Sequence, residues 1–200
     1  MIKVLVVEDQ ALVRGAISAL LGLDPHIDVI AEASNGKEAL QSLQEHTPDI
    51  ILTDIEMPEV TGLELAEHLN KSGHKAKVVI MTTFSRAGYI RRALNHGVRG
   101  FVLKEAPSEY LVDTLKKVMQ GQKVIDPELA INALDDADPL TEKERKALRL
   151  AGEGMTTAQI ANNLYLGEGT VRNYLSEAIS KLNATNRIDA ARIAKQKGWL

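Results

Sequence analysis

Cysteine is absent from this 200-residue sequence, and aromatic residues make up only 4% of it. The chain can therefore form no disulfide and no thiolate metal site, and it has no thiol nucleophile. Its five histidines lack the spacing of a metal site. No apolar run approaches the roughly 20 residues that span a bilayer, and the first residues show no signal peptide. We therefore expect a cytoplasmic protein with no membrane insertion.

A net positive charge is found only near the C-terminus. The formal net charge of the whole chain is −3, yet residues 139–200 carry 10 Lys and Arg against 6 Asp and Glu. Residues 121–138 carry 1 against 5. A basic terminal segment is typical of a nucleic-acid-binding module. With an ordinary globular share of 44% hydrophobic residues, the pattern predicts two small domains, 1–120 and 139–200, joined by an acidic linker.

Short β-branched runs alternate with helical patterns through the first 120 residues. The runs are residues 3–7, 29–33, 50–53, 78–81 and 100–103. Each is nearly all apolar, as in strands buried on both faces, and apolar residues between the runs recur at helical spacing. This alternation predicts an α/β domain with a doubly wound, five-stranded parallel sheet.

Polar residues lie at or next to the carboxyl ends of four of these strands. They are Glu8, Asp9, Asp54, Thr82 and Lys104. In a parallel sheet all such ends open onto one crevice. Three carboxylates around one point repel each other unless a hard cation lies between them, and oxygen ligands of this kind suit Mg²⁺.

Such a crevice suits phosphoryl transfer. One carboxylate can act as the nucleophile, while a lysine and a hydroxyl bind the phosphoryl oxygens. A lone aspartate at a strand end is more often a loop cap, so the interpretation depends on the joint placement of all five residues. A metal-dependent phosphohydrolase built on the same crevice is an alternative.

The linker, residues 121–138, contains Pro127 and an aspartate-rich run, and Gly121 is expected to end the helix before it. A short helix over residues 128–134 is compatible with this segment. After Pro139 the pattern becomes wholly helical, with capping-box spacing at Thr141 and at Thr156. Apolar spacing predicts four helices, the third beginning near residue 168 and the last covering residues 187–197, as an all-α helix-turn-helix bundle.

The motifs of the first domain resemble the receiver domain of two-component response regulators, which has a flavodoxin-like fold. They are Glu8 with Asp9, Asp54 with Met57, Pro58 and Gly62, then Thr82, and the segment 101–104. The resemblance implies that Asp54 is the phosphoacceptor and that a sensor histidine kinase is the donor. It implies a Mg²⁺ site formed by Asp9, Asp54 and the backbone carbonyl of Glu56, with Glu8 assisting. It also implies that Thr82 and Phe101 form a switch, and bulky Phe84 is a candidate shield for the phosphoaspartate.

The last 60 residues resemble the LuxR-type DNA-binding domain. The resemblance lies in Leu140 with Thr141 and Glu144, and in the segments 158–161, 169–175 and 181–182. Together the two domains resemble the NarL/FixJ class of transcription regulators. In a helix-turn-helix the third helix enters the major groove, so the candidate base contacts are Arg172, Asn173 and Ser176. The candidate phosphate contacts are Thr156, Thr157, Thr170, Lys181, Asn186 and Arg187.

One recognition helix covers only half a site, so we expect a homodimer on double-stranded promoter DNA, favoured by phosphorylation. Contact with RNA polymerase is compatible with that role. Two surfaces of the receiver could form the dimer. One consists of its first and fifth helices, and the other of its fourth helix, fifth strand and fifth helix; the sequence does not choose between them. A helical domain that only docks proteins is the other alternative. The chain is expected to be a switch, not an enzyme, and a narrower resemblance is to regulators of membrane-lipid desaturase expression.

Overall fold

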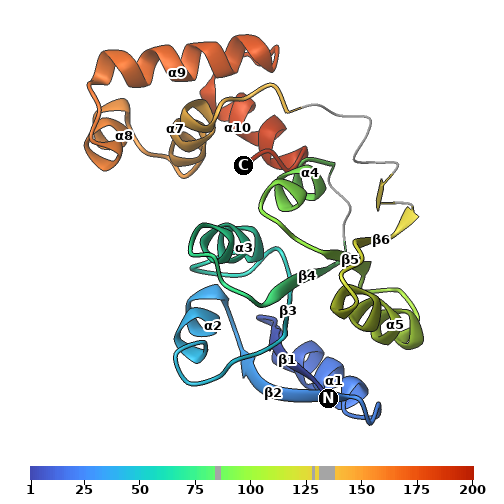
Figure 1. Cartoon of the computed structure of the whole chain (residues 1–200). Coiled ribbons are helices and arrows are strands. Elements are labelled where there is room, and N and C mark those ends of the chain that lie inside the picture. The colour runs from blue at the N-terminus through green and yellow to red at the C-terminus, as the bar shows by residue number, and fades with distance from the viewer. Residues whose placement is uncertain (84–86, 128, 131–137) are drawn as a thin grey trace. The chain divides into compact units, whose positions relative to one another are not determined.

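The computed structural model describes residues 1–83, 87–127, 129–130 and 138–200. The chain divides into two compact units, one formed mainly by residues 1–131 and the other mainly by residues 132–200 (Figure 1). Each unit is described by itself. Among the described residues, every helix is too short or too polar to cross a bilayer.

The first unit is built on a parallel sheet. Its strands are β1 (Ile2–Val7), β2 (Ile27–Ala33), β3 (Ile50–Thr53), β4 (Lys77–Thr82), β5 (Gly100–Leu103) and β6 (Val124–Ile125). They lie in the order β2-β1-β3-β4-β5-β6, with every neighbouring pair parallel. The five predicted strands are confirmed. The sixth was not predicted, because a two-residue strand is too short to show a periodicity.

Helices cover both faces of this sheet (Figure 1). They are α1 (Ala11–Leu21), α2 (Gly36–Ser42), α3 (Gly62–Lys71), α4 (Ala87–Asn95) and α5 (Ser108–Met119). On one face α1 and α5 bury Ile17, Leu21 and Leu115 against alternate strand residues such as Val4 and Leu52. Because the inner strands are covered on both sides, their buried stretches are apolar and polar residues lie at their ends, whereas the partly buried edge strand β2 carries Asp28 and Glu32.

Segment 121–138 is not wholly a linker. Val124 and Ile125 pair with Gly100 and Phe101 of β5 and so extend the sheet of the first unit. Gly121, with φ of +90°, adopts the left-handed conformation expected of a residue that ends a helix. The short helix compatible with residues 128–134 lies largely outside the described residues.

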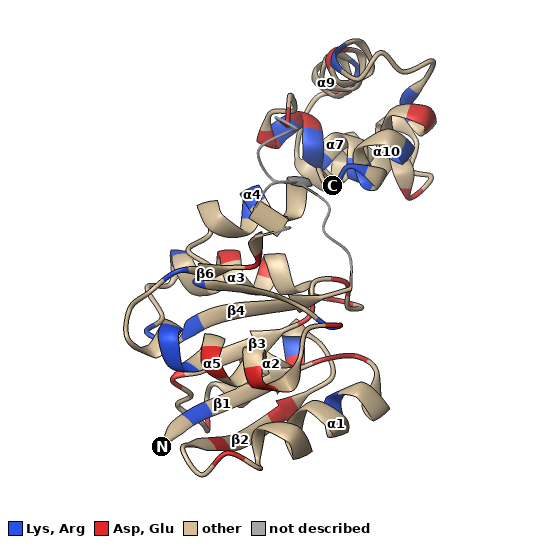
Figure 2. Ribbon diagram, turned by 90° about the vertical axis from the view of Figure 1, so that its right-hand side faces the viewer, with Lys and Arg blue, Asp and Glu red and all other residues tan. Residues whose placement is uncertain are grey.

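The second unit contains the four predicted helices. They are α7 (Glu142–Gly152), α8 (Thr157–Leu164), α9 (Glu168–Lys181) and α10 (Arg187–Gln196). Both capping boxes are confirmed, at Thr141 with Glu144 and at Thr156 with Gln159. Buried Leu148, Ile160 and Val171 belong to one shared core. Basic and acidic residues are interspersed over α7, α9 and α10 (Figure 2).

Candidate functional sites

The acidic cluster forms where β1 and β3 end. Glu8 and Asp9 follow β1, Asp54 follows β3, and one carboxylate oxygen from each lies within 4.8 Å of the others. Glu8 is 1% exposed and Asp54 9%, whereas Asp9 is exposed. The structure therefore brings together three acids of which the outermost, Glu8 and Asp54, are 46 residues apart in sequence. An oxygen-only donor set of this kind fits a hard divalent cation such as Mg²⁺.

Lys104 joins two of the acids. Its Nζ lies 2.7 Å from Oε2 of Glu8 and 2.9 Å from Oδ2 of Asp54. Its backbone N–H donates to the carbonyl of Thr82, the buried last residue of β4, at 2.8 Å. The strand-end pairing of β4 and β5 thus fixes the lysine backbone opposite the acids. The ammonium offsets repulsion between two carboxylates that are both nearly inaccessible to water.

Burial perturbs the ionisation of this cluster. It raises the pKa of Glu8, the negative charge of Asp54 raises it further, and the ion pair with Lys104 only partly opposes them. Burial alone would lower the pKa of Lys104, but its hydrogen bonds and ion pairs with Glu8 and Asp54 outweigh burial and raise it. The lysine is therefore held in its charged form beside the acids.

The backbone after β3 is tightly fixed around Asp54. Its Oδ1 accepts a hydrogen bond from the N–H of Ile55 at 2.7 Å, and its own N–H donates to the carbonyl of Val7 at 3.0 Å. At the start of α3, the N–H of Gly62 donates to the carbonyl of Ile55 at 3.0 Å. One carboxylate oxygen is thus held by the backbone, and the other faces Lys104.

Three other residues were named from the sequence for this site. Glu56 lies three residues after the end of β3 and is exposed. Phe101 in β5 is fully buried between its pairing partners Ile80 and Ile125. Phe84 lies outside the described residues. The roles of Glu56 and Phe101 stay predictions.

On α9 the candidate base contacts share one exposed side. Arg172, Asn173 and Ser176 are exposed, whereas Val171 and Leu175 are buried in the core of the unit. The Arg172 guanidinium lies 3.4 Å from the carboxylate of Glu168, and the two largely exposed side chains form a weak ion pair. Such a pair contributes little and can be exchanged for another partner.

Two candidate phosphate contacts already cap helices. Oγ1 of Thr156 accepts from the N–H of Gln159, and Oδ1 of Asn186 accepts from the N–H groups of Ile188 and Asp189, both at 2.9 Å. Three others lie at helix starts. They are Thr157, Thr170 and Arg187, of which Thr170 is exposed and the other two are half-buried. Their contacts to phosphate stay predictions.

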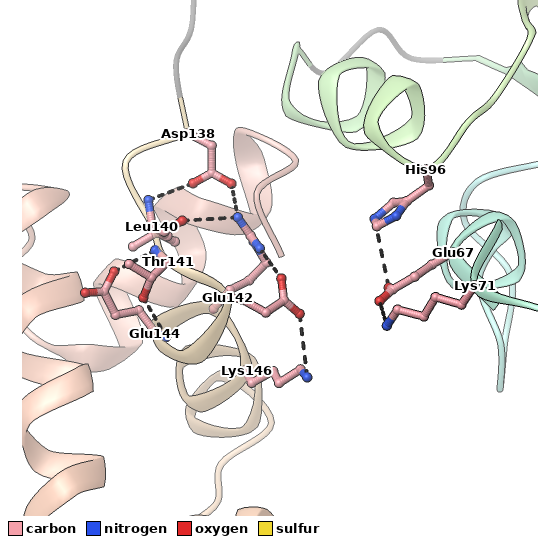
Figure 3. A network of polar contacts seen from close by, with 10 residues as sticks. Glu67, Lys71, His96, Asp138, Leu140, Thr141, Glu142, Glu144 and Lys146 are labelled. Atoms are coloured by element: carbon pink, nitrogen blue, oxygen red, sulfur yellow. Dashed lines mark hydrogen bonds and ion pairs between the residues drawn. The ribbon is translucent and has the colours of Figure 1, made fainter.

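Lys181 has a structural partner that the sequence did not indicate. Its Nζ lies 2.8 Å from both carboxylate oxygens of Glu144, which is 5% exposed. Glu144 also accepts from the N–H of Thr141 at 2.8 Å (Figure 3). The pair joins the C-terminal end of α9 to the first turn of α7. Any phosphate contact by Lys181 would compete with this pair.

The pKa of Glu144 is lowered, whereas that of Glu8 is raised. Burial alone would raise it, but the hydrogen bonds and charge of Lys181 and the N–H of Thr141 outweigh burial, so the pKa of Glu144 is lowered. Next to it, Arg145 binds Asp138, Glu142 and the carbonyl of Leu140. The start of α7 is therefore held by two adjacent ionic networks.

Two features near the sites were not found from the sequence. Arg14 in α1 donates to the backbone carbonyl of Glu8, a contact that spacing alone cannot reveal. Tyr165 between α8 and α9 has φ of +55° and is 95% exposed. The sequence predicts a tight turn at Tyr165. It does not predict the left-handed conformation of this residue, because glycine or asparagine usually marks such a position.

Family comparisons match both domains. Residues 4–116 match the model of the response regulator receiver domain, and residues 138–194 match that of bacterial regulatory proteins of the luxR family. The chain is 47% identical over 200 residues to the uncharacterized transcriptional regulatory protein YvfU of Bacillus subtilis, covering 100% of both. It is 41% identical to the transcriptional regulatory protein DesR of the same organism, covering 100% of this chain and 99% of DesR.

Solved structures show the same fold. The response regulator ChrA of a heme-sensing two-component system has a TM-score of 0.58 and 31% identity, with coverage of 100% of this chain and 98% of ChrA. An RcsB–DNA complex has a TM-score of 0.67 and 21% identity, with coverage of 97% and 98%. At that identity the second likeness shows the fold alone.

Proposed function

Because the chain belongs to the response regulators that join a receiver domain to a LuxR-type DNA-binding domain, we propose that phosphorylation of Asp54 controls its binding to promoter DNA. As a member of this family it is a DNA-binding regulator of transcription and belongs to no classical enzyme family. The observation that carries the proposal is the geometry of Asp54, which has Lys104 at 2.9 Å and the carboxylates of Glu8 and Asp9 beside it.

In the proposed transfer, a carboxylate oxygen of Asp54 attacks the phosphorus of a phosphohistidine on a sensor kinase. The new P–O bond forms as the P–N bond breaks, and the imidazole leaves with the bond's electron pair. Asp9, Asp54 and the Glu56 carbonyl, with Glu8 assisting, would hold Mg²⁺, which when bound offsets charge on the phosphoryl oxygens.

Residues around Asp54 then hold the product. Lys104 exchanges its carboxylate contact for a phosphoryl oxygen, and the Thr82 hydroxyl binds another. Movement of Thr82 and Phe101 then shifts the receiver between two states and favours a DNA-binding homodimer. The homodimer would form through one of the two receiver faces named above and, in the DNA-binding domain, through α10 around the exposed Ile188. We further propose that a sensor histidine kinase is the phosphoryl donor, that the DNA-bound dimer contacts RNA polymerase, and that the protein is cytoplasmic.

Phosphorylation should change DNA binding only when Asp54 is present. We expect full-length protein treated with acetyl phosphate and Mg²⁺ to protect promoter DNA from nuclease at lower concentration than untreated protein. Asp54→Ala should show the untreated pattern under both conditions, because it lacks the nucleophile. The measurement is footprinting on genomic promoter fragments. Equal protection in all four samples contradicts control by Asp54 while leaving DNA binding itself intact.

Arg172→Ala should weaken binding to the cognate site by about 1 to 3 kcal/mol and reduce discrimination against substitutions at one base pair. The reason is the exposed place of its guanidinium on α9. Arg187→Ala is the comparison variant and should weaken cognate and random duplexes alike, with a smaller salt dependence. Fluorescence anisotropy with both duplexes at several salt concentrations measures these differences. Equal loss on both duplexes for Arg172→Ala would assign it to phosphate contact.

Target genes are a further proposal. The narrower resemblance noted above points to membrane-lipid desaturase genes, but the chain shares more identity with YvfU than with DesR, so other stress or nutrient genes remain candidates.

Salt-dependent duplex binding separates the DNA-binding role from a purely protein-docking role. Repeated turnover of free phosphoesters would instead favour the phosphohydrolase alternative.

A further inference from the structure

The loop between β1 and α1 carries two of the three clustered acids and has little local support, since its one local side-chain contact in the described part of the chain is a long bond of 3.4 Å from the N–H of Gln10 to Oε1 of Glu8. Helix α1 begins after Gln10, which, within the described residues, makes no side-chain capping hydrogen bond, and the first turn of α1 contains no acidic residue. A helix start of this kind leaves the preceding loop poorly fixed. Glu8 and Asp9 nevertheless need a fixed orientation if they are to bind a cation together with Asp54.

Arg14 supplies the missing support from one turn inside α1. Its Nη1 donates to the backbone carbonyl of Glu8 at 2.6 Å, and its Nε lies 3.3 Å from Oε2 of Glu32 in β2. The N–H of Glu8 donates to the carbonyl of Ala33 at 3.0 Å. The backbone of Glu8 is thus held at its nitrogen by β2 and at its oxygen by Arg14.

We propose that Arg14 is a positioning residue for the magnesium site, setting the backbone from which Glu8 and Asp9 project. This inference rests on the proposed function, because it assumes that the acidic cluster binds Mg²⁺. The guanidinium suits the task because its rigid fork reaches two acceptors at once, which an ammonium on a flexible stem does less well. The side chain is only 20% exposed, so its packing restricts its geometry further.

The sign of the effect separates this proposal from simple electrostatics. A positive charge near the cluster repels a cation, so if charge dominated, removing it would tighten Mg²⁺ binding. If positioning dominates, removal weakens binding because the carboxylates lose their shared orientation. Arg14→Met removes charge and hydrogen bonds while keeping an aliphatic side chain, and Arg14→Lys keeps the charge but loses the fork. Positioning predicts weaker binding in both.

Calorimetric titration of the full-length, unphosphorylated protein with Mg²⁺ tests the proposal without any phosphotransfer. Loss of an outer hydrogen bond to metal ligands typically costs tenfold or more in metal affinity, so we expect Arg14→Met and Arg14→Lys to raise the Kd for Mg²⁺ about tenfold. Glu32→Gln is the matched control. It removes the ion pair of Arg14 but keeps the bond to the Glu8 carbonyl, and it should change Kd by less than about threefold.

The outcomes are distinguishable. Unchanged or tighter Mg²⁺ binding in both Arg14 variants overturns the positioning role, and so does a loss in Glu32→Gln equal to theirs. Absence of Mg²⁺ binding by wild type overturns the proposed magnesium site itself, and the positioning role with it. Far-UV circular dichroism identifies a variant that does not fold. Arg14→Lys keeps most of the side-chain volume and carries the decision if Arg14→Met unfolds.

Discussion

Gly62→Ala should destabilise the receiver domain by at least the 1 to 3 kcal/mol that overpacking usually costs. A Cβ at this position would lie 1.9 Å from the carbonyl oxygen of Asp54 and 3.1 Å from Oγ1 of Thr53. The first of these is a backbone atom, so no side-chain rotation can relieve the collision. The first turn of α3 and the segment after β3 must move apart, which also strains the hydrogen bond from Gly62 to the Ile55 carbonyl.

The same movement should reach the site, because Ile55 also holds one carboxylate oxygen of Asp54. We therefore expect Gly62→Ala to slow phosphorylation by acetyl phosphate at least tenfold, since a misplacement of about 1 Å can cost about 100-fold in rate. Urea denaturation and hydrogen exchange of β3 amides measure the stability, and incorporation of labelled phosphoryl group measures the chemistry.

Gly15→Ala is the matched control for this substitution. Among the described residues nothing lies within 4 Å of a Cβ built at Gly15, which is exposed in the middle of α1. Alanine is favoured over glycine inside a helix by about 1 kcal/mol, so this variant should be slightly stabilised. Equal loss of stability in Gly15→Ala and Gly62→Ala would contradict the close-approach explanation.

Strand-end residues were predictable because burial of the sheet on both faces leaves little choice for polar side chains. Glu8, Asp54 and Lys104 follow runs such as residues 50–53 that are nearly all apolar, and parallel strands bring their carboxyl ends to one edge. The apolar runs and the parallel sheet that their alternation with helices implies were therefore enough to predict the crevice. They could not predict that Lys104 bridges Glu8 and Asp54, because that depends on side-chain conformations.

Contacts between distant segments account for most of what sequence reasoning missed. Arg14 reaches a backbone carbonyl, and any residue supplies one, so no residue type in the sequence marks the partner. Gly62 was noted as part of a motif, but the reason for glycine, a close approach to Asp54, appears only when α3 and the end of β3 are packed. β6 was hidden because its two residues show no periodicity and pair with β5 only after the chain has passed through α5.

On the DNA-binding side, the exposed face of α9 was predictable from helical spacing, whereas the fate of Lys181 was not. A lysine near the end of a recognition helix is a natural phosphate contact. Glu144 was recognised only as the second half of a capping box, and that role is confirmed. Its second role, binding Lys181 across the bundle, depends on how α7 packs against α9.

Glu144→Ala should therefore cost the DNA-binding domain about 3 kcal/mol, the lower end of the range for removing one partner of a buried ion pair. The lower end applies because Lys181 is 31% exposed and can turn to water. Trp199 lies in the core of this domain, so its fluorescence during urea denaturation reports the loss. Glu142→Ala, in the same helix turn, removes a 61% exposed side chain and should cost less than about 1 kcal/mol. Similar losses in both would contradict a special role for Glu144.

Acid should remove the same stabilisation. Lys181 and the Thr141 N–H hold the pKa of Glu144 below its ordinary value, against burial, which alone would raise it. A carboxyl group whose pKa is lowered by folding stabilises fully above its unfolded pKa, about 4.3 for glutamate. That stabilisation is lost as pH falls through the lower, folded value. The difference in unfolding free energy between wild type and Glu144→Gln should therefore be constant from pH 7 to about 5 and shrink as pH drops below about 4. A difference that stays constant to pH 3 would show that the lost stability comes from shape and not from charge.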